Sequence, residues 1–331
     1  MSWYFDVGKE SDVVISTRIR LARNIANINF LNKISNEDEE KILENFKNEK
    51  IVDLSFYKLS EVDDITKQSL VEKYILSKDI LNKKNGAFLL SDDESISVLI
   101  NEEDHIRIQS FESGFDFENA YKKAKVVDKE IAKIIEYAYS EKYGYLTTCP
   151  TNLGSGIRAS LMLHLPALRI SGRIQRILDV VNKANITVRG VYGEGTSTIG
   201  DLYQVSNKVS LGVSDEEVIN SIKNIANTII KKEREARELL IKTGIDFEDK
   251  LYRMFGNLVY AKKIDYNECS KLVSNVKLGV DLGIIKEIDL EKINKIRILC
   301  KVASLQKHFK RNMDADERDA MRGRLIREII K

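Results

Sequence analysis

The hydrophobic pattern of the chain changes once, near residue 214, and this change constrains the fold more than any other feature of the sequence. Between Val13 and Leu211 the chain repeats short apolar runs rich in β-branched residues, which are typical of strands. Two of these runs, Ala87–Leu90 and Ile96–Ile100, flank a short polar loop and predict a β-hairpin. Further strands are predicted at 13–15, 105–110, 187–191 and 202–211, and helices at 36–48, 61–81 and 116–140. The mixture predicts an α+β fold with a mainly antiparallel sheet flanked by helices.

Beyond Ser214 every segment has the period of a helix. Ser214 and Glu217 form a capping box, which predicts a helix that ends near Gly244. Three more helices, each preceded by an Asp, are predicted at 265–283, 289–310 and 314–330. The sequence therefore predicts an α+β domain over residues 1–243 and an all-helical C-terminal domain over residues 244–331.

Charge and composition exclude several classes of function. A formal net charge of +2 over 331 residues creates no global field that attracts a nucleic acid, and aromatic and basic residues are not interleaved. No run approaches the roughly 18 apolar residues that span a bilayer. The cysteines, Cys149, Cys269 and Cys300, are odd in number and widely spaced, which argues against a disulfide framework and a zinc site. We therefore expect a cytoplasmic protein with no membrane or nucleic-acid partner.

The segment Ser16–Asn24 is the first candidate for binding phosphate. If it is a strand, Arg18 and Arg20 project from the same face. Two forked guanidinium groups on one face can bind a single polyphosphate. Taken alone, the segment is more typical of a solvated basic edge strand.

The segment Asn101–Arg107 is the second candidate, because three acids precede a His and an Arg. Strand parity places Glu103, His105 and Arg107 on one face and the other two acids, Glu102 and Asp104, on the opposite face. This arrangement brings a carboxylate next to a phosphate-binding cation. A charged surface turn explains the segment equally well when it is considered alone.

Two glycine-rich segments complete the set. Cys149 lies among hydroxyl side chains and precedes a loop with two glycines, surroundings that can stabilise a thiolate. A lone cysteine is more often a small buried apolar residue, but the polar flanks favour a reactive thiol here. Further along, three glycines surround Glu194, which is typical either of a mobile loop that brings a carboxylate over a substrate or of a simple surface hairpin.

Together these four segments resemble the phosphagen kinases, the family of the creatine and arginine kinases. The patterns S-x-R-x-R, N-E-E-D-H-x-R, C-P-T-N-x-G-x-G-x-R and R-G-x-x-G-E occur in the order and spacing of that family. The resemblance implies a catalytic domain that binds ATP together with Mg²⁺, the metal being held by the nucleotide. It implies nucleotide-binding roles for Ser16, Arg18, Arg20, Arg107, Arg158 and Arg189. It also implies that Glu103 and Glu194 orient and deprotonate a guanidinium group, with Cys149 as a thiolate beside it.

The chain departs from the small-molecule kinases of that family in two ways. Ser16 lies close to the start of the chain, so we expect the N-terminal helical domain that encloses a small substrate to be missing. In addition, Leu99, Met162 and Gln204 replace a Trp, a His and an acidic residue, which alters the surroundings expected for adenine.

An open acceptor site followed by a helical domain resembles the bacterial protein-arginine kinases of the McsB type. The run Glu317–Gly323 is similar to the R-D-x-x-R-A segment that forms their phosphoarginine-binding pocket, with Gly in place of Ala. By this resemblance Arg318 and Arg322, four residues apart on a helix, bind the phosphoryl group and Asp319 binds the guanidinium. Without the resemblance, a solvated helix face is the simpler interpretation.

The resemblance therefore implies a protein-arginine kinase, an ATP:protein-arginine N-phosphotransferase that marks proteins for a stress response or for proteolysis. It implies protein substrates with exposed or unfolded arginines, an activator protein, the AAA+ protease machinery as a partner, and a homodimer. Two alternatives stay open: a kinase of a free guanidino metabolite, and a non-catalytic phosphoarginine-binding adaptor. The complete catalytic set argues against the adaptor.

Overall fold

The computed structural model describes residues 2–47, 49–182, 186–190 and 198–331. Within these ranges eight strands form one sheet, in which every pairing is antiparallel. In spatial order the strands are β2 (Leu54–Lys58), β3 (Ala87–Ser91), β4 (Ile96–Ile100), β5 (Ile106–Ser113), β1 (Val14–Arg23), β8 (Ile157–His164), β10 (Leu202–Asn207) and β9 (Ile186–Gly190). A short ribbon pairs β6 (Tyr139–Ser140) with β7 (Gly144–Tyr145). The predicted α+β class and the β3–β4 hairpin are confirmed.

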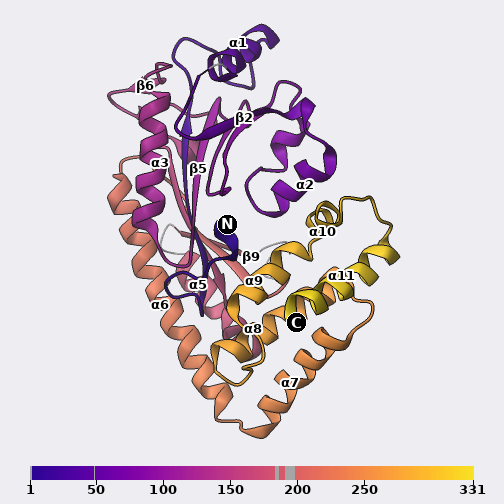
Figure 1. Cartoon of the computed structure of the whole chain (residues 1–331). Coiled ribbons are helices and arrows are strands. Elements are labelled where there is room, and N and C mark those ends of the chain that lie inside the picture. The colour runs from indigo at the N-terminus through magenta and orange to yellow at the C-terminus, as the bar shows by residue number, and fades with distance from the viewer. Residues whose placement is uncertain (1, 48, 183–185, 191–197) are drawn as a thin grey trace.

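Helices cover one face of the sheet and part of the other, and a separate group of helices follows (Figure 1). The α-helices are α1 (Asn36–Lys47), α2 (Asp64–Glu72), α3 (Phe117–Ile131), α4 (Pro166–Ile170), α5 (Ile174–Asn182), α6 (Asp215–Ile241), α7 (Ile245–Tyr260), α8 (Tyr266–Asp281), α9 (Leu290–Leu299), α10 (Val302–Phe309) and α11 (Ala315–Ile330). The 3₁₀ turns are η1 (Trp3–Phe5), η2 (Leu59–Glu61), η3 (Asp79–Asn82) and η4 (Pro150–Asn152). No helix in these ranges is long and apolar enough to cross a membrane.

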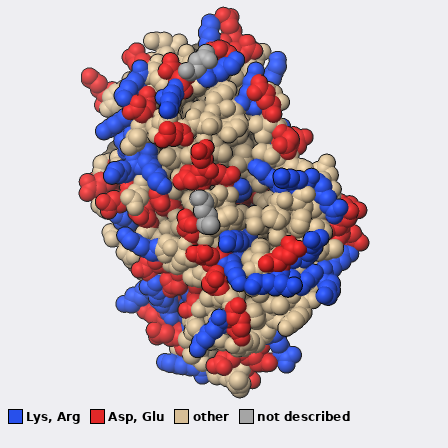
Figure 2. All heavy atoms as spheres, viewed as in Figure 1, with Lys and Arg blue, Asp and Glu red and all other residues tan. Residues whose placement is uncertain are grey.

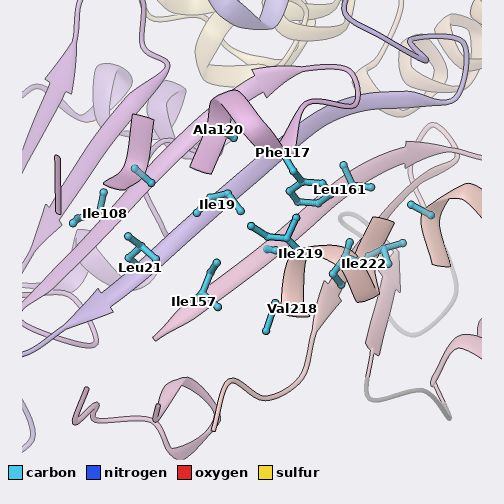
Figure 3. Close-up of a cluster of buried hydrophobic side chains, with 14 of the residues drawn as sticks. Ile19, Leu21, Ile108, Phe117, Ala120, Ile157, Leu161, Val218, Ile219 and Ile222 are labelled. Atoms are coloured by element: carbon cyan, nitrogen blue, oxygen red, sulfur yellow. The ribbon is translucent and has the colours of Figure 1, made fainter. Parts of the chain in front are cut away.

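The main core lies between the sheet and helices α3 and α6. Ile19 of β1, Phe117 of α3 and Ile219 of α6 belong to one buried apolar cluster, part of which is drawn in Figure 3. Because side chains alternate across a strand, burying Ile19 on this face places Arg18 and Arg20 on the other face. One face of the sheet therefore forms the main core. The other, which we call the polar face, carries the arginines beside a smaller apolar cluster, in which Leu99, directly opposite Arg107, packs with Leu70 of α2.

The helices after α6 bury a second apolar cluster of their own, which includes Val276 of α8 and Ile326 of α11. Between α6 and α7 lies Gly244, whose φ of 75° is in the left-handed region that favours glycine. The domain boundary predicted at residue 244 falls at this turn and stays a prediction. The sequence did not predict helices α4, α5 and α7 or strands β2, β6, β7 and β8.

Three predicted helices are too long, because tertiary contacts end them early. The helix predicted at 61–81 ends at Glu72, and Tyr74 follows with a left-handed φ of 66°. The helix predicted at 116–140 ends at Ile131, and Tyr137 then forms a β-bridge back to the first strand region. The helix predicted at 289–310 is divided into α9 and α10 by extended backbone at Lys301 (ψ 159°).

Candidate active site

The predicted phosphate-binding residues share the polar face of the sheet. Arg107 lies on β5; Ser16, Arg18 and Arg20 lie on β1; Arg158 lies on β8; and Arg189 lies on β9. Arg20 is directly opposite Arg158, and Ala22 on the same side of β1 is opposite Arg107. The pairing of β8, β10 and β9 places Arg189 on this face as well. Since residues directly opposite each other share a face of the sheet, all five arginines converge there, as predicted from the sequence for Arg18 and Arg20.

The arginines of this face repel one another. Burial, followed by the charge of the nearby Arg158, lowers the pKa of Arg18 to about 10. Burial and its arginine neighbours also lower the pKa of Arg20. The pKa of Arg158 is lowered by burial and by neighbouring arginines, whereas the charges of Glu103 and Cys149 raise it. An anion of several charges would relieve this repulsion, so the arginine face is suited to a polyphosphate.

The positive charge of this face is local. On the side of the molecule shown in Figure 2, basic and acidic side chains are interspersed, as expected for a net charge of +2.

Two serine hydroxyls orient arginines within the face: Arg18 Nε donates to Ser160 Oγ at 3.3 Å, and Arg158 Nη2 donates to Ser206 Oγ at 3.3 Å.

A cavity adjoins the arginine face at the Ser16 end of β1. It is lined by Ser16, Arg18, Met162 and Gln204, among others. It shares Ser16 and Met162 with a deeper cavity whose far wall comes from helices α8 and α9. The C-terminal helices therefore form part of the surroundings of the arginine face.

The acidic segment lies in the turn between β4 and β5, where strand parity does not apply. Asn101 has a φ of 60°, and its N–H donates to the carbonyl of His105 at 2.9 Å, so the chain reverses there. Arg107 Nη1 donates to Glu102 Oε1 at 2.7 Å, and Arg107 Nη2 donates to Glu103 Oε2 at 2.5 Å. The prediction that Glu102 faces away from Glu103 and Arg107 is wrong, because both acids flank the same guanidinium group.

The predicted position of His105 beside Glu103 is also wrong. Its side chain is fully buried, its Nδ1 accepts from the N–H of Ile25 at 3.0 Å, and its Nε2 lies 3.0 Å from the carbonyl oxygen of Asn29. Because Nδ1 accepts, Nε2 carries the proton and donates. Burial lowers the pKa of this imidazole. His105 thus holds the segment after β1 in place.

Glu102 and Ser77 are site residues that the sequence interpretation missed. Glu102 is 1% exposed, and it also accepts from Ser77 Oγ at 2.5 Å and from the N–H of Glu103 at 2.8 Å. The residue before Glu102 could have revealed its position. Asn101 indicates a turn, because Asn adopts left-handed backbone more readily than most residues. Ser77 has no local signal, because it reaches the turn only through the tertiary fold.

Cys149 lies on a loop that is tied to the same turn. Asp104 Oδ1 accepts from the N–H of Thr148 at 2.6 Å, so the turn that carries Glu103 also positions the residue before the cysteine. Cys149 Sγ lies 3.1 Å from Thr151 Oγ1. The structure therefore brings Glu103 and Cys149 to the same end of the arginine face, near Arg158.

Glu194, the second predicted carboxylate, lies outside the described residues. Among the residues that are described, no group of three or more His, Cys, Asp or Glu side chains could hold a metal ion.

The three residues of the C-terminal motif lie on α11, but one of them is packed inside the protein. Arg322 is 1% exposed and donates to the carbonyls of Ile264 and Cys300 at 2.7 and 2.8 Å. It also donates to Asp319 Oδ1 at 2.7 Å. Arg318 is half-buried and donates to the backbone carbonyl just before the helix. Arg322 therefore joins α11 to neighbouring segments, and a phosphoarginine-binding role for the three residues stays a prediction.

Two protein-family profiles match the chain. The ATP:guanido phosphotransferase C-terminal catalytic domain matches residues 35–236, and the protein-arginine kinase McsB C-terminal domain matches residues 244–331. A protein-arginine kinase of Clostridium tetani is 42% identical to this chain, and the match covers 100% of this chain and 98% of the relative. A protein-arginine kinase of Bacillus pumilus is 40% identical and matches 99% of this chain and 93% of the relative.

Solved structures share the fold of about two thirds of the chain. The duplicated taurocyamine kinase from Schistosoma mansoni superposes with a TM-score of 0.59 at 25% identity over 67% of this chain, which spans 33% of that kinase. A lombricine kinase superposes with a TM-score of 0.59 at 23% identity, over 71% of this chain and 68% of its own.

Proposed function

The chain belongs to the protein-arginine kinase family, which joins an ATP:guanido phosphotransferase catalytic domain to a McsB C-terminal domain, and on this premise we propose that it transfers the γ-phosphoryl group of ATP to arginine side chains of proteins. The observation that carries the proposal is the convergence of arginines on one sheet face, with Glu103 and Cys149 at one end of it. This arrangement provides a binding site for a polyphosphate beside a carboxylate that can receive a guanidinium group.

The arginines hold the nucleotide in this proposal. Arg18, Arg20, Arg107, Arg158 and Arg189 bind the phosphates, and Ser16 contacts the nucleotide beside them. Their mutual repulsion supports this role, because the face is assembled with its positive charge in place before any anion arrives. Positioning and charge neutralisation are the main contributions of a protein to phosphoryl transfer. We propose that Mg²⁺ is held by the phosphates of ATP and adds its charge to that of the arginines.

Glu103 orients the acceptor and receives its proton. A guanidinium group has a pKa above ~12 and is a poor nucleophile while it is protonated. As a nitrogen of the substrate arginine forms its bond to the γ-phosphorus, the bond to the bridging oxygen breaks, ADP leaves, and the nitrogen loses a proton to the Glu103 carboxylate. Glu103 is suited to this because its side chain is 40% exposed at the end of the arginine face. We assign Glu194 as the second carboxylate and Cys149 as a thiolate that contacts the acceptor.

Other properties are proposed from membership of the family alone. They are a homodimer, an activator protein, delivery of phosphorylated proteins to an AAA+ protease in a stress response, and a cytoplasmic location. The binding of phosphoarginine by Arg318, Asp319 and Arg322 belongs to the same proposal.

The reaction is tested with γ-labelled ATP and either an unfolded protein or free arginine as acceptor. We expect an acid-labile label on the protein, as a phosphorus–nitrogen bond requires, and a lower kcat/KM for free arginine. Glu103→Gln should lower turnover by ~10²–10⁴, the usual effect of losing a general base, with little change in ATP affinity. Glu118→Gln, at an exposed position of α3, is the matched control. An acid-stable label, or a preference for free arginine, would overturn the proposal.

A further inference from the structure

Exposed apolar side chains gather at one place near the Cys149 loop. Tyr139 is 60% exposed and Leu211 is 47% exposed, and Tyr143 and Val213 are exposed as well. These four residues line one open groove of about 430 Å³ between the β6–β7 ribbon and the segment that leads into α6. We call this surface the apolar groove. Large apolar side chains that remain in water near a reaction site are a frequent mark of a binding surface.

The floor of the apolar groove is backbone. A Cβ atom on Gly154, whose φ is 109°, would lie 2.5 Å from the carbonyl oxygen of Ser210. A Cβ atom on Gly144 would lie 2.5 Å from the carbonyl oxygen of Gly154. Three chain segments therefore pack closely there with no side chain between them, and the aromatic and aliphatic residues form the rim.

The apolar groove borders the loop that carries Cys149. The N–H of Tyr145 donates to the carbonyl of Gly154 at 2.7 Å, so these two groove residues close the base of the loop that carries Cys149. Ser210 Oγ donates to the carbonyl of Leu153, the last residue of that loop, at 3.0 Å. The other side of the loop is fixed to the turn that carries Glu103. The same loop thus separates the apolar groove from the arginine face.

We propose that the apolar groove binds the polypeptide substrate by receiving a large apolar side chain that lies a few residues from the target arginine. This inference rests on the proposed function and names the class of substrate: segments of unfolded protein in which an arginine has an aromatic or aliphatic neighbour. Folded proteins bury most such side chains, so the groove favours chains that have lost their structure.

The charge pattern supports this occupant. Among the described residues that line the apolar groove, Lys142 is the one charged side chain. A substrate arginine is therefore repelled from the groove, whereas Glu103 at the active site attracts it. The apolar side chain and the arginine of one substrate polypeptide therefore bind on opposite sides of the Cys149 loop.

The test uses two peptides of equal length and net charge, each with one arginine. One carries Phe and Leu within a few residues of the arginine, and the other carries Ser at those positions. We expect the Tyr139→Ser/Leu211→Ser variant to lose at least about fivefold in kcat/KM for the apolar peptide, with no change for the Ser peptide. Tyr260→Ser/Ile245→Ser, at two still more exposed positions of α7, is the matched control and should change neither value.

Each other outcome counts against the proposal. Equal kcat/KM for the two peptides with the wild-type enzyme, or equal losses for both with the groove variant, would show that the groove does not select apolar substrates. A change in oligomeric state of the groove variant by sedimentation, with substrate preference retained, would show that a second copy of the chain occupies the groove. If the wild-type enzyme phosphorylates neither peptide nor an unfolded protein, the proposed function itself fails and this proposal with it.

Discussion

At the scale of single residues, the site depends on one buried carboxylate. Glu102 holds Arg107 from one side while Glu103 contacts the same guanidinium from the other. Glu102 also accepts from the backbone N–H of Glu103. If Glu102 lost its charge, Arg107 would pair more strongly with Glu103 and draw it away from the acceptor. Glu102 is therefore a positioning residue that keeps the proposed base available.

We expect Glu102→Gln to lower kcat by about tenfold or more, since one charge-assisted hydrogen bond contributes ~1.5–3 kcal/mol. ATP affinity should not fall, because the substitution removes a negative charge from the phosphate-binding face. Turnover and the Kd for ATP are measured separately, and a melting temperature shows that the variant is folded. A kcat within roughly threefold of wild type would contradict the positioning role.

The C-terminal motif divides into two kinds of residue. Arg322 satisfies two backbone carbonyls inside the protein, whereas Arg318 is half-buried and bonded to one carbonyl at the helix start. We expect Arg318→Ala to weaken phosphoarginine binding by at least about tenfold in calorimetry, with little change in stability. Arg322→Ala should also lower the free energy of unfolding by about 3 kcal/mol or more, because it leaves Asp319 and buried carbonyls unpaired. Unchanged affinity in Arg318→Ala would show that this part of the motif is only a solvated helix face.

At the scale of elements, α10 begins without a cap of its own and obtains one from α2. Lys301 at its N-cap position makes no side-chain cap hydrogen bond. Instead the carboxylate of Glu72, the last residue of α2, accepts from the N–H groups of Ala303 and Ser304, both at 2.8 Å. Figure 1 shows α2 and α10 as neighbours. A negative charge at a helix N-terminus is favourable, so this contact both starts α10 and joins it to the first part of the chain.

We expect Glu72→Ala to lower the free energy of unfolding by ~1–3 kcal/mol, the combined effect of losing a cap and leaving backbone N–H groups unpaired. Glu72→Gln should cost less, because the amide oxygen can still accept. Urea denaturation measures both, with Glu61→Ala at an exposed position near α2 as the control. Equal stability of Glu72→Ala and Glu61→Ala would contradict a capping role.

At the scale of the whole molecule, Lys301 makes stability depend on pH. It is buried and donates to the backbone carbonyl of Glu72. Burial, followed by the charge of Arg297, lowers its pKa to about 7, while Glu72 acts in the opposite direction. An unfolded lysine has a pKa near ~10.4, so between about pH 7 and 10 the unfolded chain binds a proton that the native chain has lost. The contribution of Lys301 to stability therefore rises with pH across this window.

We expect Lys301→Met to be most stabilising, relative to wild type, at pH 7 and progressively less so toward pH 10. The difference in unfolding free energy should shrink by up to ~1.4 kcal/mol per pH unit within that window. Urea denaturation of both proteins at several pH values measures it, and comparing them cancels the titration of other groups. A difference that is constant with pH would show that Lys301 keeps an ordinary pKa.

What the sequence determines by itself in this protein is local and periodic. The alternation of side chains along a strand places Arg18 and Arg20 on one face whatever the rest of the chain does, and capping residues mark the start of α6 and α11. The α+β class follows from the same patterns. One local signal was overlooked: Asn101 indicates the turn that brings Glu102 to Arg107.

The contacts between segments that are far apart in the sequence were decided by the tertiary structure alone. Glu72 caps a helix 231 positions later in the chain, and Ser77 reaches Glu102 from the end of a loop. The burial of Arg322 follows from carbonyls that other helices supply. The residues that flank these positions in the sequence give no indication of such contacts. Periodicity and capping are properties of a few consecutive residues, whereas these partners are set by how the sheet and the helices pack.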